Sequence, residues 1–309
     1  MRKFAARFAT VWGLTGAPMP NEVTDIWSQA QIITPHTVPK YFKATREMLM
    51  VRLGQYIWKP KPDAVERAFK MLQPSVRFAL DDVVELPEVI KRTIDVDLSP
   101  AQSVAYKELK KHLAIQLKDN RQIVAQNAGA IVNKLLQIAG GWCYAHAPSY
   151  VSFNPEARVN SLVELVESAA RKVLVFAPYT HTILELGPHF EKAGIEHCTV
   201  YGATKQRELI FNDFQNTDRY KVMVAHPGTV GHGLTLTAAD TIIWYLPVPD
   251  LDIYDQANAR IRRVGQLHKQ QIFHLQSTGV EKRFYGILAS KTKVQDKFLE
   301  MIEEATDDR

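Results

Sequence analysis

Short apolar runs alternate with stretches of helical period in the second half of the chain, from about residue 156 onward. The apolar runs are rich in β-branched and aromatic residues, and the stretches between them repeat apolar residues every three or four positions. The runs predict strands at 173–177, 198–201, 221–225, 241–246 and 271–275, and the stretches predict helices at 156–170, 180–193, 204–216, 250–264 and 279–305. Because apolar strands separated by helices are typical of a sheet covered on both faces, we predict an α/β fold with a parallel sheet.

The ends of these strands indicate where a ligand would bind. Open parallel sheets bind their ligands beyond the carboxyl ends of the strands. The loops that are expected there follow Ala177, Tyr201, Ala225 and Leu246.

The first half of the chain, from about residue 27 to residue 155, has mainly the helical period. It predicts helices at 40–53, 64–72, 99–113 and 122–138, and the alternating end of segment 83–97 predicts a strand. Ser99 can cap the third of these helices, and Pro100 suits its first position. Residues 1–10 predict a short helix that leads into a strand at 11–14.

The composition is that of an ordinary globular protein with room for two compact units. Of its 309 residues, 46% are hydrophobic and 23% are charged. The 38 lysines and arginines exceed the 33 acidic residues by a net charge of +5, which permits a polyanionic partner without requiring one. No stretch approaches the roughly 18 apolar residues of a membrane span, so we expect no membrane partner.

The cysteines and the N-terminus bear on the compartment. Cys143 and Cys198 cannot form a disulfide framework, and neither has the second close ligand pair of a zinc site. We therefore expect no metal site and a reducing, cytoplasmic setting. The basic residues 1–10 resemble a targeting peptide, but their apolar part is interrupted by Arg7 and no Ala-x-Ala site follows, so export is the lesser alternative.

Segment 256–266 carries the most informative chemistry. On the predicted helix 250–264, Gln256, Arg260 and Arg263 are aligned along one flank at i, i+4 and i+7, and Gly265 can end the helix. Arginine is permanently charged and binds phosphate through two parallel hydrogen bonds. This flank therefore suits an anionic ligand, and the alternative is an ordinary solvated basic face.

A glycine-rich loop follows the third predicted strand of the second half. Gly228, Gly231 and Gly233 allow the backbone to approach a ligand and to present N–H donors to phosphate. Leu236 occupies the position where a dinucleotide-binding fingerprint requires its third glycine, so that interpretation fails. The alternative is a flexible connecting loop. Segments 202–207 and 12–21 are weaker signals of the same kind.

Taken in order, these segments resemble the C-terminal portion of the Swi/Snf-like branch of superfamily-two helicases and translocases, and phage-encoded members are the closest in style. Residues 14–21 match the third motif, LTGTPxxN, and residues 172–176 resemble the fourth. Residues 202–207 resemble the element that follows it, 231–240 resemble motif V, GxGLNLxxAD, and 256–266 resemble motif VI, QAxDRxxRxGQ. Ala17, Thr235 and Ala259 depart from these patterns.

The resemblance implies a RecA-like parallel sheet, the helicase C-terminal lobe, preceded by a mainly helical linker region. It divides the chain into the end of the first lobe with the third motif, the linker, the second lobe, and a C-terminal helix and tail. These parts span 1–35, 36–155, 156–290 and 291–309.

The resemblance also implies roles for individual residues in an ATPase. Arg263 would be the arginine finger, Arg260 its partner, and Gln256 would position near the γ-phosphate. Thr15, Gly16, Gly231 and Gln266 would bind ATP or couple its site to nucleic acid, and Gly233, Thr235 and Arg207 would contact nucleic acid. DNA is the expected nucleic acid, with RNA as the alternative.

One expected part is absent from the sequence. It contains no Gly-Lys dipeptide, hence no phosphate-binding loop of the Walker type, and no Asp-Glu-x-His box precedes Leu14. ATP and Mg²⁺ would therefore be held by a first RecA-like lobe, in cis or in trans, and we expect this chain alone to be inactive. The alternatives are a non-hydrolysing nucleic-acid-binding or assembly module that acts with a separately encoded ATPase lobe, and another nucleotide-binding α/β enzyme.

Overall fold

The computed structural model divides the chain into two compact units, residues 1–83 and residues 84–309. It describes residues 2–14, 18–19, 22–54, 58–75, 85–119, 121–146, 149–230 and 234–290. Residues 112–119, 121–128 and 145–146 lie in helices or strands, but their side chains are outside this description. The boundary between the units falls within the predicted linker region.

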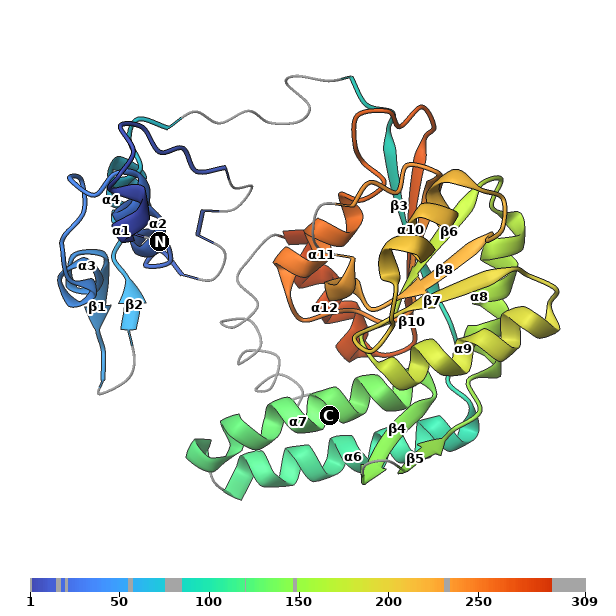
Figure 1. The fold of residues 1–309 in the computed structure, drawn as a ribbon. Helices are drawn as coiled ribbons and strands as arrows, with labels where there is room; N and C mark the ends of the chain where they lie inside the picture. Colours follow the sequence, from blue (N-terminus) through green and yellow to red (C-terminus); the bar gives the residue numbers. More distant parts are fainter. Residues whose placement is uncertain are drawn as a thin grey trace. The chain divides into compact units, whose positions relative to one another are not determined.

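The first unit is small and mainly helical (Figure 1). It comprises α1 (Arg2–Ala5), α2 (Ile26–Ile33), α3 (Phe42–Leu49), β1 (Met50–Arg52), β2 (Trp58–Pro60) and α4 (Ala64–Met71), and β1 pairs with β2 in the antiparallel sense. Its core includes Ile26, Ala30, Leu49, Ala64 and Ala68. The sequence predicted the helix of α4 closely, whereas the helix predicted at 40–53 ends at Leu49 and continues as a strand.

The strand predicted at 11–14 is wrong. These residues have no regular secondary structure, and the side chains of Trp12 and Leu14 are 85% and 99% exposed. An isolated extended segment is stable only when a neighbouring strand satisfies its backbone groups, and the described residues provide no such neighbour here.

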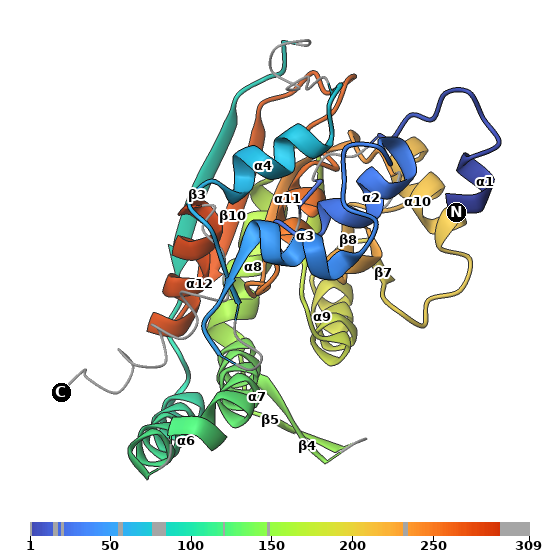
Figure 2. The ribbon, with the colours of Figure 1, turned by 90° about the vertical axis from the view of Figure 1, so that its left-hand side faces the viewer.

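The second unit is built around a six-stranded sheet in which every pair of neighbours is parallel. The strand order is β3-β10-β9-β6-β8-β7, so β3 and β10 lie side by side at one edge (Figure 2). The strands are β3 (Val89–Asp95), β6 (Lys172–Phe176), β7 (His197–Val200), β8 (Val222–Ala225), β9 (Ala239–Trp244) and β10 (Gln270–Gln276). The strands predicted in the second half of the chain are confirmed with small shifts of their ends, and the α/β fold with a parallel sheet is confirmed as the fold class.

Helices cover both faces of this sheet because alternate strand residues point to opposite sides. Along β6, Leu174 and Phe176 join one core, whereas Val173 and Val175 join the other. The first core is covered by α10 (Arg207–Asn216), α11 (Leu251–Asn258) and α12 (Gly279–Ser290), and the second by α8 (Glu156–Ser168) and α9 (Thr180–Lys192). Figure 1 shows α11 and α12 on the left of the sheet and α8 on its right.

Along the chain, a helical hairpin lies between β3 and the next strand of this sheet, β6. It consists of α6 (Pro100–Asp119) and α7 (Arg121–Gly140), followed by the antiparallel pair β4 (Trp142–His146) and β5 (Ser149–Ser152). As predicted, Ser99 caps α6: the Gln102 N–H donates to Ser99 Oγ, and the Ser99 N–H donates to Gln102 Oε1 at 2.9 Å. This reciprocal pair is a capping box. In the described part of the chain, no helix is long and apolar enough to cross a membrane.

Candidate functional site

The helix α11 carries the first part of the predicted site, and it starts where the sequence indicates. The Ile253 N–H donates to the Asp250 carboxylate at 3.1 Å, which satisfies an N–H that the helix leaves without a backbone partner. Tyr254 and Ala257 are buried against the sheet, and Gln256 is exposed. The helix places the Gln256 amide in solvent.

This helix ends at Asn258, six residues before its predicted end. The Arg260 carbonyl accepts from the Leu236 N–H at 3.0 Å, and the Ile261 carbonyl accepts from Gln266 Nε2 at 3.1 Å. The Leu236 amide and the Gln266 side chain therefore take the places that amides four residues onward have in a helix. The predicted alignment of Gln256, Arg260 and Arg263 along one flank of a continuous helix is wrong.

Arg260 is nevertheless fixed within the site. Its side chain is only 4% exposed, and its Nη1 donates to the Leu234 carbonyl at 3.1 Å. Burial lowers the pKa of Arg260, and the positive charge of Arg263 lowers it further. Two guanidinium groups therefore repel each other in a partly desolvated place, and a bound anion would relieve this repulsion.

Arg263 connects the turn to the glycine-rich loop. Its side chain is half-buried, and its Nη1 donates to Thr235 Oγ1 at 3.3 Å. The structure thus brings together two residues to which the sequence assigns different ligands. Gly231 and Gly233 of the same loop, and Thr15 and Gly16 of the third motif, lie outside the described residues.

The side chain of Gln266 is buried in this segment and forms hydrogen bonds with its backbone. It is 3% exposed, and its Nε2 donates to the carbonyls of Ala239 at 2.9 Å and Ile261 at 3.1 Å. Its Oε1 accepts from the His268 N–H at 3.1 Å. The amide of Gln266 holds backbone groups of the turn and of β9 together.

These contacts place the arginines at the amino-terminal edge of the sheet. Ala239 is the first residue of β9, and Gln270, which begins β10, follows the turn directly. The prediction that the ligand-bearing loops follow the carboxyl ends of the strands is therefore wrong for Arg260 and Arg263. The reason is that α11 runs back along the sheet and delivers its C-terminal turn to the opposite edge.

Arg207 lies at the carboxyl edge, apart from the two other arginines. It follows β7 and begins α10, and its guanidinium donates to the carbonyls of Gly202 and Thr204, the latter at 3.1 Å. Thr204 Oγ1 accepts from the Tyr201 N–H at 2.9 Å. In this structure the Arg207 side chain bonds the backbone of the loop that precedes it.

A buried ion pair supports the second unit, and the sequence analysis did not identify it. Arg158 on α8 and Glu281 on α12 are 2.6 Å apart, with side chains 2% and 0% exposed. Glu281 Oε2 also accepts from the Thr278 N–H at 3.0 Å. The spacing Thr278-x-x-Glu281 is that of a capping box, so half of this arrangement was readable from the sequence.

A second buried contact fixes α11 on the sheet. Tyr254 Oη and His274 Nε2 of β10 are 2.8 Å apart. Burial lowers the pKa of His274 to about 4, and the positive charge of Lys91 adds to this effect. Among the described residues, no group of three or more His, Cys, Asp or Glu side chains is placed to hold a metal ion.

Comparison with known proteins agrees with this geometry. Residues 157–265 match the family described as the helicase conserved C-terminal domain, and this range contains α11, Arg260 and Arg263. We refer to this range, by that similarity, as the helicase domain. This match, together with the relatives and the solved structures described below, confirms the resemblance to the C-terminal portion of Swi/Snf-like helicases.

Curated relatives match almost the whole chain and not the helicase domain alone. The chain is 24% identical over 298 residues to an ATP-dependent helicase of Mycoplasma pneumoniae, covering 93% of this chain and 27% of the relative. It is 26% identical over 288 residues to the protein p41 of the Acyrthosiphon pisum secondary endosymbiont phage 1, covering 89% of this chain and 59% of the relative. The chain thus spans between about a quarter and three fifths of the length of these relatives.

Solved structures share the fold of the helicase domain. The C-terminal part of the Fun30 ATPase domain superposes with a TM-score of 0.57 at 14% identity, covering 71% of this chain and 97% of that one. The Sulfolobus solfataricus SWI2/SNF2 ATPase core in complex with double-stranded DNA superposes with a TM-score of 0.54 at 23% identity, covering 95% of this chain and 62% of that one.

Proposed function

We propose that this chain supplies the C-terminal half of an ATP-dependent nucleic-acid helicase or translocase. The observation that carries the proposal is the turn after α11, where Arg263 bonds Thr235 and Arg260 bonds Leu234 of the glycine-rich loop. The helicase C-terminal domain and the ATP-dependent helicases among the relatives support it.

In this proposal Arg263 acts on the phosphate that ATP transfers. Its guanidinium is half-buried and held by a single described hydroxyl contact, so it keeps further donors for an anion. Stabilising the charge that develops on the transferred phosphoryl group is worth on the order of 10³–10⁵ in rate for an arginine finger. Arg260, which bonds the loop directly, holds the turn in place and adds a second positive charge.

The roles of the remaining predicted residues follow from their positions. Thr235 would couple the nucleic-acid contact to Arg263, because one hydrogen bond joins them. Gln266 would position the turn, since its amide is buried and bonded to backbone carbonyls. Gln256 is exposed on α11 and keeps its proposed place near the γ-phosphate. Gly231, Gly233, Thr15 and Gly16 keep their sequence-based assignments as proposals.

ATP is the proposed substrate, and Mg²⁺ would be held by another RecA-like lobe. The sequence contains no Walker lysine, and among the described residues no acidic cluster suits a metal ion. Neutralising the β- and γ-phosphates needs such a cradle as well as arginines. We therefore expect this polypeptide to hydrolyse ATP only together with a first lobe, in cis or in trans.

The proposed nucleic acid is DNA, and the proposed setting is the bacterial or phage-infected cytoplasm. The Sulfolobus ATPase core was solved with double-stranded DNA, and one relative is a phage protein. RNA is the alternative partner.

The alternative function is a non-hydrolysing nucleic-acid-binding or assembly module that acts beside a separately encoded ATPase lobe. ATP turnover by a two-lobe protein that contains this chain, with and without Arg263, separates the two functions.

A further inference from the structure

The net positive charge of the chain is concentrated in its first unit. Residues 1–83 contain 12 of the 38 lysines and arginines but only 7 of the 33 acidic residues, so they account for the whole net charge of +5. The helicase domain lies in the other, electrically balanced unit. The excess charge is therefore unrelated to Arg260 and Arg263.

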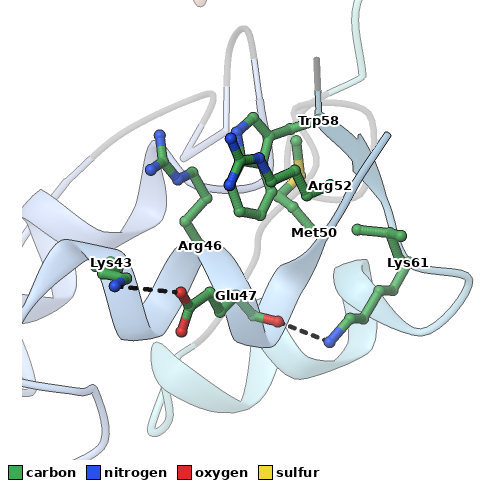
Figure 3. Close-up of a pocket in the computed structure, with 8 residues that line it drawn as sticks. Lys43, Arg46, Glu47, Met50, Arg52, Trp58 and Lys61 are labelled. Atoms are coloured by element: carbon green, nitrogen blue, oxygen red, sulfur yellow. Dashed lines mark hydrogen bonds and ion pairs between the residues drawn. The ribbon is translucent and has the colours of Figure 1, made fainter. Parts of the chain in front are cut away.

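Much of this charge surrounds one hollow on the first unit, which we call the basic hollow (Figure 3). Its volume is about 730 Å³, and it is lined from α3, β1, β2 and the residues before α4. The charged and aromatic side chains that line it are Lys43, Arg46, Arg52, Lys61, Glu47 and Trp58. Among these, four cations face one carboxylate.

That carboxylate does little to neutralise the hollow. Glu47 lies 3.9 Å from Lys43 on the same helix, and both side chains are mostly exposed. Lys61 Nζ bonds the backbone carbonyl of Glu47 at 2.7 Å, not its carboxylate (Figure 3). An exposed pair at this distance is weak, since water screens it. The basic hollow thus keeps a positive field.

Other cations of the same unit are differently placed. On α4, Arg67 lies 2.6 Å from Asp63 and Lys70 lies 2.7 Å from Glu66. Each of these charges has a close carboxylate partner. The unit therefore offers a comparison between two cations on α4 and the cations that line the basic hollow.

Arg46 gives the hollow its specific geometry. The guanidinium carbon lies 4.4 Å from the centroid of the Trp58 ring, so a cation–π contact orients it. Its Nε is buried and has no hydrogen-bond partner among the described residues. A buried donor without an acceptor is costly, and a phosphate oxygen is a strong acceptor for guanidinium.

We infer that the basic hollow binds phosphate groups of a nucleic-acid backbone. Four cations around one hollow, with a guanidinium fixed on an aromatic ring, combine the two features of sequence-independent nucleic-acid sites: positive charge and an aromatic surface. The inference rests on the proposed function only in taking nucleic acid as the ligand. It assigns to the first unit a nucleic-acid contact separate from the helicase domain.

The test compares two double variants of the full chain. Lys43→Gln/Arg52→Gln removes two charges from the basic hollow, and Arg67→Gln/Lys70→Gln removes two from the paired cations of α4. Binding to a short fluorescent DNA duplex of random sequence is measured by anisotropy between about 50 and 200 mM salt, because each lost phosphate contact lowers the salt slope by about one. Thermal melts of all variants show that they are folded.

The hollow variant is expected to bind at least about tenfold more weakly, with a salt slope lower by about two, and the α4 variant should stay within about twofold of the wild type. Arg46→Lys, which keeps the charge but loses the planar contact with Trp58, should weaken binding by a smaller factor. Equal losses in the two double variants, or no loss in either, would overturn the inference.

Two further readouts separate the ligand and the site. If the hollow variant lost affinity for inorganic tripolyphosphate but not for the duplex, the ligand would be a free polyphosphate and the inference would fail. Failure of the hollow variant to differ from the wild type leaves the proposed role of Arg263 intact, whereas normal ATP turnover by a two-lobe Arg263→Ala protein leaves the hollow intact.

Discussion

The Arg263 guanidinium donates to the Thr235 hydroxyl at 3.3 Å, although 28 residues separate the two along the chain. One residue belongs to the turn after α11, and the other to the loop that leads into β9. The bond joins the two segments that resemble motifs V and VI of the Swi/Snf-like family.

The first prediction concerns this bond. In a two-lobe protein, Thr235→Ala should lower the nucleic-acid stimulation of ATP turnover by roughly tenfold, because a hydrogen bond to a charged group contributes about 1.5 kcal/mol. Turnover without nucleic acid should change little. Steady-state phosphate release with and without DNA measures both, and Thr237→Ala, two residues onward, is the control. Equal stimulation in Thr235→Ala and the wild type would contradict the coupling role.

The second prediction concerns the buried pair of Arg158 and Glu281. Removing one partner leaves the other charge buried, so Glu281→Ala should destabilise the second unit by about 3–5 kcal/mol. The melting temperature should fall by roughly 10 °C, given about 2–4 °C for each kcal/mol in a unit of this size. The exposed pair Arg219–Asp213 is the comparison, since its arginine is 65% exposed. Similar melting temperatures for Glu281→Ala and Asp213→Ala would show that burial has no such effect.

The third prediction concerns pH. The pKa of His274 is lowered to about 4 by burial, whereas an unfolded chain binds this proton near pH 6.5. Between these values the unfolded state holds more protons, so stability is full above pH 6.5 and is lost as the pH falls toward 4. At pH 5 the loss is about 2 kcal/mol relative to pH 7.5.

Urea denaturation at the two pH values, for the wild type and for His274→Gln, checks this prediction. The glutamine can keep a hydrogen bond to Tyr254 but does not titrate. The wild type should lose more stability on acidification than the variant does. The same loss in both proteins would mean that His274 is not the responsible group.

The fourth prediction is that the chain by itself releases no phosphate from ATP, even with nucleic acid present. No Walker lysine is present in the sequence to neutralise the phosphates. A phosphate-release assay on purified protein tests it. Turnover that disappears in Arg263→Ala, which excludes a contaminating ATPase, would show that the catalytic groups lie within this chain.

The sequence predicted the parallel sheet well because each strand carries its own signal. The apolar run that becomes β6 is readable from a few adjacent residues, and so is the capping box of Ser99 and Gln102. The turn after α11 was not readable in this way. In that turn the carbonyls of Arg260 and Ile261 accept from the Leu236 amide and from the Gln266 side chain, and the periodicity of the sequence shows neither contact.

The prediction of where Arg260 and Arg263 lie was wrong for a related reason. The rule that ligands bind at carboxyl ends of strands describes the loops directly after strands, such as that of Arg207. It does not describe a turn that α11 carries to the opposite edge. The basic hollow was also not predicted, because its cations come from α3, from β1 and from the segment between β2 and α4, which only the tertiary fold brings together.

The most direct test of the central claim is ATP turnover by a two-lobe protein, made by joining this chain to the first RecA-like lobe of a Swi/Snf-like helicase. Arg263→Ala should lower turnover by at least about a hundredfold while ATP binding persists, because an arginine finger acts mainly on the transition state. Arg262→Ala, which removes the same charge from the neighbouring residue, should change turnover little. Equal effects of the two substitutions would contradict the assignment of Arg263 as the residue that acts on ATP.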